Sequence, residues 1–140
     1  MSSIAPGEVP VLPTRSGGVR RKPDATLPAW ALGSPFFSMT RSDDELSIVC
    51  EEQRIPKDQK QDGGWRCLKV HGPLKMTEVG ILASLATNLA QAKVCLLAIS
   101  THDTDYLLCK DEQLCAACEV LRHQGHTVHD ARENASSLEG

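Results

Sequence analysis

The chain has 140 residues, of which 41% are hydrophobic and 24% are charged, and its formal net charge at pH 7 is -3. This size and composition predict one modest hydrophobic core, or two halves of one core. The acidic balance gives no long-range attraction to phosphate backbones, and the basic run Arg15–Lys22 is short and lacks interleaved aromatic residues. We therefore expect no nucleic-acid partner.

The sequence also indicates no contact with a membrane. It lacks a run of about 18 apolar residues, and its first residues contain Ser, Pro and Gly where a signal peptide needs a charged and then an apolar segment. We therefore expect a cytoplasmic protein whose six cysteines are mostly reduced thiols. Most of them lie in apolar runs, where a free cysteine packs as a small hydrophobic residue.

The N-terminal half contains one predicted hairpin. Residues 1–27 are rich in proline and glycine, and we expect them to form a mobile arm. Phe36–Thr40 is predicted as a strand, and Leu46–Val49 as the strand that returns after an acidic turn. Residues 28–60 thus form a predicted half-module. The polar stretch Glu51–Gly64 is expected to be a surface loop or a connector between two structured parts.

The C-terminal half begins with a predicted strand at Trp65–Val70. Thr77 is a plausible N-cap for a helix that runs to about Ala92, because leucines and alanines recur there at helical spacing. Val94–Ile99 is continuously apolar and of strand length. A run of this kind predicts a central strand that is buried on both faces.

The remaining predicted elements are a strand, a helix and a last short strand. Asp105–Cys109 is predicted to return as the hairpin partner of the apolar strand, and a helix is expected from about Asp111 to Arg122. Thr127 and Val128 begin a last short strand, and residues 130–140 form a polar tail that we expect to be disordered. From residue 64 to 129 the order is therefore β-α-β-β-α-β, which predicts an α+β, ferredoxin-like domain.

A search for internal repeats aligns the two predicted hairpins. At an offset of 60, Thr40–Leu46 lies over Ser100–Tyr106, and Glu51–Gln53 lies over Asp111–Gln113. If this repeat is real, the N-terminal part is a shortened copy that lacks its first helix. Chance similarity between two hairpins with acidic turns is the alternative.

The segment Ser100–Tyr106 is the strongest candidate for a functional site. It places two carboxylates, an imidazole and several hydroxyls directly after the most apolar strand. Carboxylates attract an ammonium group, and free N–H groups at a helix start, near Val79–Ile81, attract a carboxylate. This combination suits the two charged ends of an amino acid. A well-capped hairpin without a ligand is the alternative, because Asp and Thr are good turn residues.

Several separated motifs resemble one family. The segments Gly64–Val70, Gly72–Leu74, Gly80–Leu85 and Ala98–Leu108, together with Leu27–Trp30 and Phe36–Cys50 upstream, look like small proteins with paired ACT-like modules. Well-known relatives are the ACT modules of CASTOR-type cytosolic arginine sensors and of the regulatory regions of aspartate kinases. The resemblance covers about Pro28 to Val128 and implies a ferredoxin-like ACT domain at residues 64–129, which binds an amino acid and dimerises without catalysis.

The resemblance also implies a set of ligand contacts. They come from the helix start and from the hairpin: Val79, Gly80, Ile81, Ser100, Thr101, Asp103, Thr104 and Asp105. Two segments depart from the family pattern. Lys75–Glu78 is more polar than usual before the glycine, which affects specificity, and Arg15–Lys22 stands where the family has a first strand, which predicts that this strand is degraded.

Two other chemistries are less well supported by the sequence. Cys115 and Cys118 form a C-x-x-C pair with histidines nearby, but two cysteines within one helix do not have the geometry of a zinc knuckle. No Gly-x-Ser-x-Gly, phosphate-binding glycine loop or His-Glu-x-x-His motif is present. We therefore expect a non-enzymatic regulatory protein without a cofactor or metal. Its expected partners are an amino acid and either a second copy or a regulated protein. The alternatives are a ligand-free interaction module and a thiol or metal protein.

Overall fold

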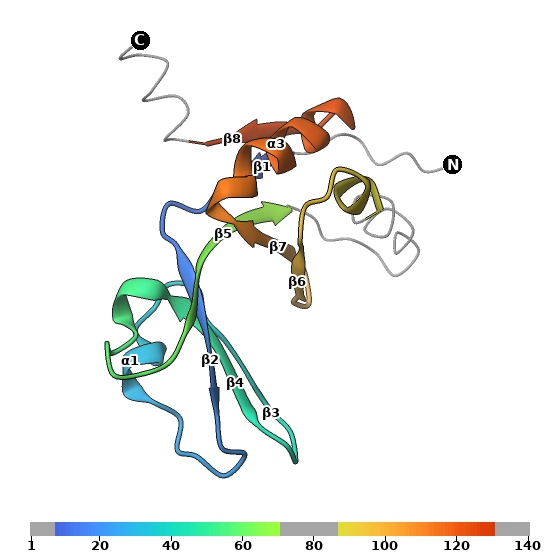
Figure 1. The fold of residues 1–140 in the computed structure, drawn as a ribbon. Coiled ribbons are helices and arrows are strands. Elements are labelled where there is room, and N and C mark those ends of the chain that lie inside the picture. The colour runs from blue at the N-terminus through green and yellow to red at the C-terminus, as the bar shows by residue number, and fades with distance from the viewer. Residues whose placement is uncertain (1–7, 71–86, 131–140) are drawn as a thin grey trace. The chain divides into compact units, whose positions relative to one another are not determined.

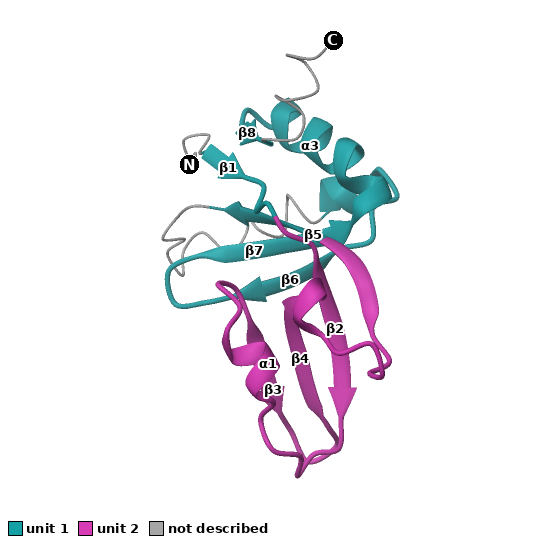
Figure 2. Cartoon of the chain, turned by 90° about the vertical axis from the view of Figure 1, so that its left-hand side faces the viewer, with its two compact units in different colours: residues 1–13, 66–140 teal, residues 14–65 magenta. Residues whose placement is uncertain are grey.

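The structure is a computed structural model that describes residues 8–70 and 87–130 (Figure 1). The chain divides into two compact units, which Figure 2 shows in different colours. Unit 1 contains residues 1–13 and 66–140, and unit 2 contains residues 14–65. Unit 2 is thus an insertion in the sequence of unit 1. The predicted boundaries at residues 28, 60 and 64 stay a prediction.

Unit 2 is a small antiparallel sheet with one short helix. Strand β4 pairs with β2 on one side and with β3 on the other, and β2 also pairs with the start of β5 through Ser16 and Trp65. Its elements are β2 (Ser16–Arg21), α1 (Ala29–Leu32), β3 (Ser38–Arg41), β4 (Leu46–Glu51), the 3-10 helix η1 (Glu52–Arg54) and the first residues of β5 (Asp62–Val70). The predicted hairpin is confirmed as β3 and β4.

Alternation along β4 explains why this strand forms the core of unit 2. Leu46, Ile48 and Cys50 are buried with no exposed surface, while the residues between them are half-buried. They pack in one cluster with Val19 of β2 and Ile55. Burial of one face of each strand is the main favourable term that holds such a small sheet together.

Two expectations for this part of the chain are wrong. Ser16–Arg21 is the intact strand β2 and neither a mobile arm nor a degraded strand. The glycines of this stretch led to the prediction of mobility. If residue 17 carried a Cβ atom, that atom would lie 2.6 Å from the Gln61 side chain and 2.8 Å from the Ile55 side chain. This glycine therefore permits close packing. The connector Glu51–Gly64 likewise contains η1 and the start of β5.

Unit 1 joins strands from both ends of the sequence. Within it, β7 lies between β5 and β6 and pairs antiparallel with β6, while β1 pairs parallel with β8. Its further elements are β1 (Glu8–Pro10), β6 (Leu97–Ser100), β7 (Asp105–Lys110), the 3-10 helix η3 (Asp111–Gln113), α3 (Leu114–His123) and β8 (Thr127–His129), and residues 87–91 are also helical. The secondary structure is α+β with mostly antiparallel pairing, as predicted.

The strand β1 links β8 to β5. The Val11 N–H donates to the carbonyl oxygen of His129, and the Leu12 N–H donates to that of Cys67, each at 2.8 Å. Val9 has no exposed surface and belongs to the hydrophobic core of unit 1. The expected mobile arm therefore does not include residues 8–12.

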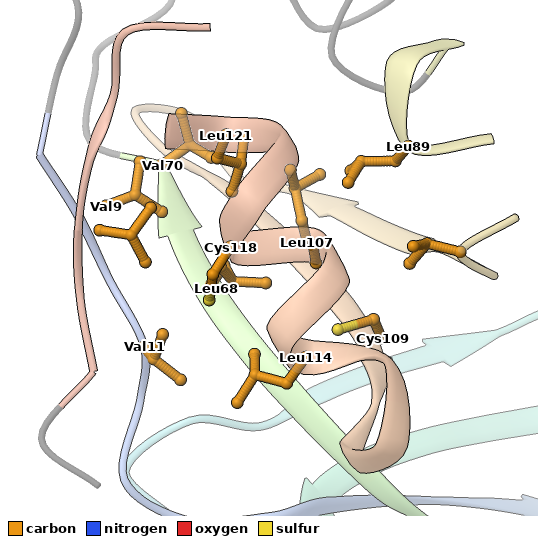
Figure 3. Packing of buried hydrophobic residues seen from close by; sticks show 13 residues of the cluster. Val9, Val11, Leu68, Val70, Leu89, Leu107, Cys109, Leu114, Cys118 and Leu121 are labelled. Atoms are coloured by element: carbon orange, nitrogen blue, oxygen red, sulfur yellow. The ribbon is translucent and has the colours of Figure 1, made fainter. Parts of the chain in front are cut away.

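Helix α3 covers this core with one apolar face. Leu114, Ala117, Cys118 and Leu121 are its buried residues and recur at helical spacing. Figure 3 shows Leu114, Cys118 and Leu121 directed toward the residues of β1 and β5 that share their cluster. The predicted helix and its buried face are thus confirmed, with a 3-10 turn before residue 114.

The apolar run at Val94–Ile99 is not a central strand. Strand β6 begins only at Leu97 and lies at one edge of the described sheet, where Leu97 is 37% exposed. The apolar run thus has two parts. Val94 and Leu96 precede the strand and pack against the core of unit 1, and β6 itself begins at Leu97. Most of the helix predicted from Thr77, and the tail after Asp130, lie outside the described residues. Within residues 8–70 and 87–130, no helix has the length and hydrophobicity to cross a membrane.

Candidate functional site

The candidate site lies at the turn of the β6–β7 hairpin. Ser100 and Asp105 are the last paired residues before the turn, and the Ser100 hydroxyl donates a hydrogen bond to the Asp105 carboxylate. Asp105 is only 7% exposed. A buried carboxylate needs hydrogen-bond donors, and Ser100 supplies one from the neighbouring strand.

The turn itself is held by a threonine. The N–H of Thr101 donates to the carbonyl oxygen of Thr104 at 2.8 Å, and the Thr101 hydroxyl donates to the same oxygen at 3.0 Å. Both hydroxyls that flank the turn are therefore engaged in hydrogen bonds within the hairpin. This geometry fixes the turn and leaves neither hydroxyl positioned as an activated nucleophile.

The structure separates the predicted site residues into two groups. Ser100, Thr101, Thr104 and Asp105 are brought together by hydrogen bonds within the hairpin, whereas Asp103 is exposed at the tip of the turn. Asp103 is thus the carboxylate of this group that is open to an approaching molecule. The predicted contacts at Val79, Gly80 and Ile81 lie outside the described residues.

Unit 2 contains a hairpin with the same local architecture. The N–H of Ser42 donates to the carbonyl oxygen of Glu45 at 2.9 Å, and the Ser42 hydroxyl lies 3.4 Å from it, as with Thr101 and Thr104. A 3-10 helix follows the second strand in both units. Ser42 and Thr101 are 59 positions apart. The two hairpins therefore correspond at an offset of 59, one less than the sequence alignment gave.

Sequence reasoning missed Arg66, which is buried in unit 1. Its side chain is 1% exposed, with Nη1 lying 3.4 Å from Asp111 Oδ1 and Nη2 donating to the carbonyl oxygen of Leu12 at 3.2 Å. Its Nε has no hydrogen-bond partner within the described structure. The signal in the sequence is an arginine between Trp65 and Cys67. Arg66 connects Leu12, two residues after β1, to Asp111 at the start of η3.

The six cysteines are all free, and four of them are buried. Burial raises the pKa of Cys67 to about 12 and that of Cys109 to about 11, and it also raises the pKa of Cys50. These thiols are protonated at neutral pH, and the thiolate is the reactive and metal-binding form. In α3, Cys118 is buried and Cys115 is exposed. Among the described residues, no group of three or more His, Cys, Asp or Glu could hold a metal ion.

Comparison with known proteins assigns the chain to a family. The ACT-domain profile matches residues 61–123, and a second profile, which describes an N-terminal domain, matches residues 17–58. The crystal structure of protein Atu0741 from Agobacterium tumefaciens is 37% identical, with a TM-score of 0.81, over 88% of this chain and 92% of that chain. The chain belongs to the ACT-domain family. The two profiles fall in unit 2 and in the stretch from β5 to α3.

Two more distant matches are named as a sensor and as a regulatory subunit. The cytosolic arginine sensor for mTORC1 subunit 1 of Rattus norvegicus is 28% identical over 98 residues, which span 64% of this chain but only 30% of the sensor. The regulatory subunit of aspartate kinase from Thermus flavus is 9% identical, with a TM-score of 0.61, over 86% of this chain and 98% of that subunit. At that identity, the likeness to the subunit shows the fold alone.

Proposed function

We propose that this ACT-domain protein is a non-catalytic regulatory module that binds an amino acid. In this proposal the ligand lies between the predicted helix start at Val79–Ile81 and the β6–β7 hairpin. The proposed contacts are Val79, Gly80, Ile81, Ser100, Thr101, Asp103, Thr104 and Asp105. The observation that carries the proposal is the exposed carboxylate of Asp103 at the tip of a hairpin whose other polar groups hold its shape.

The chemistry of the two segments supports an amino acid. Asp103 is the group that attracts the ammonium end or a cationic side chain, and the rigid turn limits the entropy lost on binding. Asp105 is largely buried and bonded to Ser100, so its proposed role is to fix the hairpin and add negative charge behind the ligand. The N–H groups of Val79–Ile81 are proposed to receive the ligand's carboxylate.

The relatives suggest which amino acids to test first. The rat relative is named as an arginine sensor, which makes L-arginine the first candidate here. Two of the solved structures that share this fold are regulatory subunits of aspartate kinase, which supports a role in reporting a ligand to a partner or through a homodimer. We further propose a cytoplasmic location, in line with the cytosolic relative.

The state of the candidate nucleophiles supports a non-catalytic role. The hydroxyls of Ser100 and Thr101 donate hydrogen bonds within the hairpin, and the pKa values of the Cys67 and Cys109 thiols are raised to about 12 and about 11. A covalent catalyst instead needs a nucleophile next to a base or with a lowered pKa. We propose no cofactor and no metal.

A second candidate is a ligand-free interaction module. The edge position of β6 within the described sheet favours it, together with the 37% exposure of Leu97 on that strand. An unpaired edge offers backbone hydrogen-bond groups to a further strand. This reading predicts concentration-dependent association that Leu97→Glu disrupts, with no effect of any amino acid.

A thermal-shift screen of the full chain against the twenty amino acids distinguishes the two candidates. Any ligand that binds only the folded state stabilises it, by about 2.7 kcal/mol at a concentration of 100 times the Kd. We expect one amino acid or one chemical class to raise the Tm. No rise with any of the twenty at millimolar concentration would reject the ligand proposal, and analytical ultracentrifugation would then test association.

A further inference from the structure

The two hairpins share an architecture but differ in the residues at one pair of positions. The last register pair before the turn is Ser100 and Asp105 in unit 1 and Arg41 and Leu46 in unit 2. Leu46 has no exposed surface and packs in the core of unit 2. At this pair, unit 2 therefore has an apolar side chain where unit 1 has a carboxylate, and a guanidinium where unit 1 has a small hydroxyl.

The Arg41 guanidinium is held by backbone carbonyl groups of its own unit. Its Nη1 donates to the carbonyl oxygen of Pro23, and its Nη2 donates to that of Ala25 at 2.6 Å. The segment that carries these oxygens is itself a turn, since the Ala25 N–H donates to the carbonyl oxygen of Lys22 at 3.0 Å. A guanidinium presents its donors as a planar fork, so two neighbouring carbonyl oxygens suit it well.

A second arginine covers the tip of the same hairpin. Nη2 of Arg20 donates to the carbonyl oxygen of Asp44 at 3.3 Å, and its Nε lies 3.8 Å from the Glu45 carboxylate. Arg20 is 69% exposed, so this ion pair is screened by water and adds little stability. It does place a positive charge of the chain itself at the acidic turn of unit 2.

We propose that the carbonyl oxygens of Pro23 and Ala25 form a guanidinium site of unit 2, which Arg41 of the same chain fills. This site suits a planar cation with two parallel donors, and it becomes open to a free guanidinium ion when Arg41 is removed. The proposal does not rest on the proposed function of unit 1.

The test replaces Arg41 and offers a free guanidinium ion in its place. In two-dimensional amide NMR spectra of the full-length Arg41→Ala variant, methylguanidinium chloride should shift the resonances of Asp24, Ala25 and Thr26. The titration extends to about 50 mM, because a ligand of so few atoms binds weakly. Wild type should show no shift at these amides beyond that caused by equal sodium chloride, since Arg41 occupies the site.

A second measurement on the same variant does not depend on binding of a free ion. Loss of the Arg41 hydrogen bonds should speed amide hydrogen exchange at Ala25 by about fivefold, the size expected for an ordinary hydrogen bond. Methylguanidinium should reverse part of this increase. Arg20→Ala is the matched control, because it removes an arginine from the same hairpin and should leave exchange at Ala25 unchanged.

Clear outcomes would overturn the proposal. Equal shifts in wild type and Arg41→Ala, no shift in either, or an unchanged exchange rate at Ala25 would each mean that Arg41 does not fill a guanidinium site. None of these results bears on whether an amino acid binds at Asp103. Conversely, failure of the amino-acid screen does not affect the interpretation of the Arg41→Ala experiments, so each proposal can be rejected without the other.

Discussion

Nη1 of Arg66 lies 3.4 Å from Oδ1 of Asp111, and this contact places a buried guanidinium against a carboxylate that is 30% exposed. Removal of Asp111 alone should lower the free energy of unfolding more than removal of both charges. Asp111→Ala leaves a buried cation without its counter-ion and should cost about 2 to 3 kcal/mol of unfolding free energy. Adding Arg66→Met should recover part of this loss, because the double variant no longer buries a charge. Urea denaturation measures both, and a double variant less stable than Asp111→Ala would contradict the assignment.

The strand β1 should be essential to the stability of unit 1. Val9 has no exposed surface and lies in the core, whereas its neighbour Glu8 is 74% exposed and contacts His129 at 3.6 Å. We expect Val9→Ala to cost about 2 kcal/mol, the usual loss for a truncated core side chain. The control, Glu8→Ala, should change stability by less than about 0.5 kcal/mol. Similar values for the two variants would show that residues 8–10 are a loose arm after all.

The buried thiols predict a loss of stability in alkaline solution. The pKa of Cys67 rises from 9.0 to about 12 and that of Cys109 to about 11, chiefly because burial disfavours the thiolate. The unfolded chain therefore loses these protons near pH 9 while the folded chain retains them. Their contribution to stability is complete below pH 9 and is lost as the pH rises toward 11 and 12. Urea midpoints at pH 8 and pH 10 should show this decrease, and a Cys67→Ala/Cys109→Ala variant should show a smaller one.

Exposure should also decide which cysteines react first. Cys95 and Cys115 are exposed, and the other four are buried. A short treatment of the native protein with iodoacetamide, followed by peptide mass analysis, should label these two and leave Cys67 and Cys118 unlabelled. Labelling of all six at similar rates would mean that the two cores open readily.

Much of the fold was predictable because burial follows simple periods. Leu114, Cys118 and Leu121 repeat at helical spacing, and the strand at Asp105 follows a clear turn, so both elements were predicted near their observed bounds. The strand β2 was missed because the glycines of Ser16–Arg21 gave the same signal as a mobile segment. The close packing of Gly17 against Gln61 and Ile55 depends on tertiary structure.

The candidate site was predictable in composition but not in how its groups are used. The sequence placed Ser100, Asp103 and Asp105 in one hairpin, yet it could not show that Ser100 is bonded to Asp105 while Asp103 is exposed. The edge position of β6 was also hidden, because an apolar run fits both a central strand and a loop that packs on the core. Strand order depends on long-range pairing that local patterns do not contain.

Binding of an amino acid at the tip of the unit 1 hairpin is tested most directly by isothermal titration calorimetry of three full-length proteins. The titrant is the amino acid with the largest thermal shift, beginning with L-arginine. The control Asp44→Ala changes the turn aspartate of unit 2, which corresponds to Asp103 at the offset of 59. We expect wild type and Asp44→Ala to bind one ligand per chain equally well, and Asp103→Ala to bind at least about tenfold more weakly, as expected for the loss of one charged hydrogen bond. Equal affinity of Asp103→Ala and wild type, or no heat of binding with any of the twenty amino acids, would contradict the proposed site.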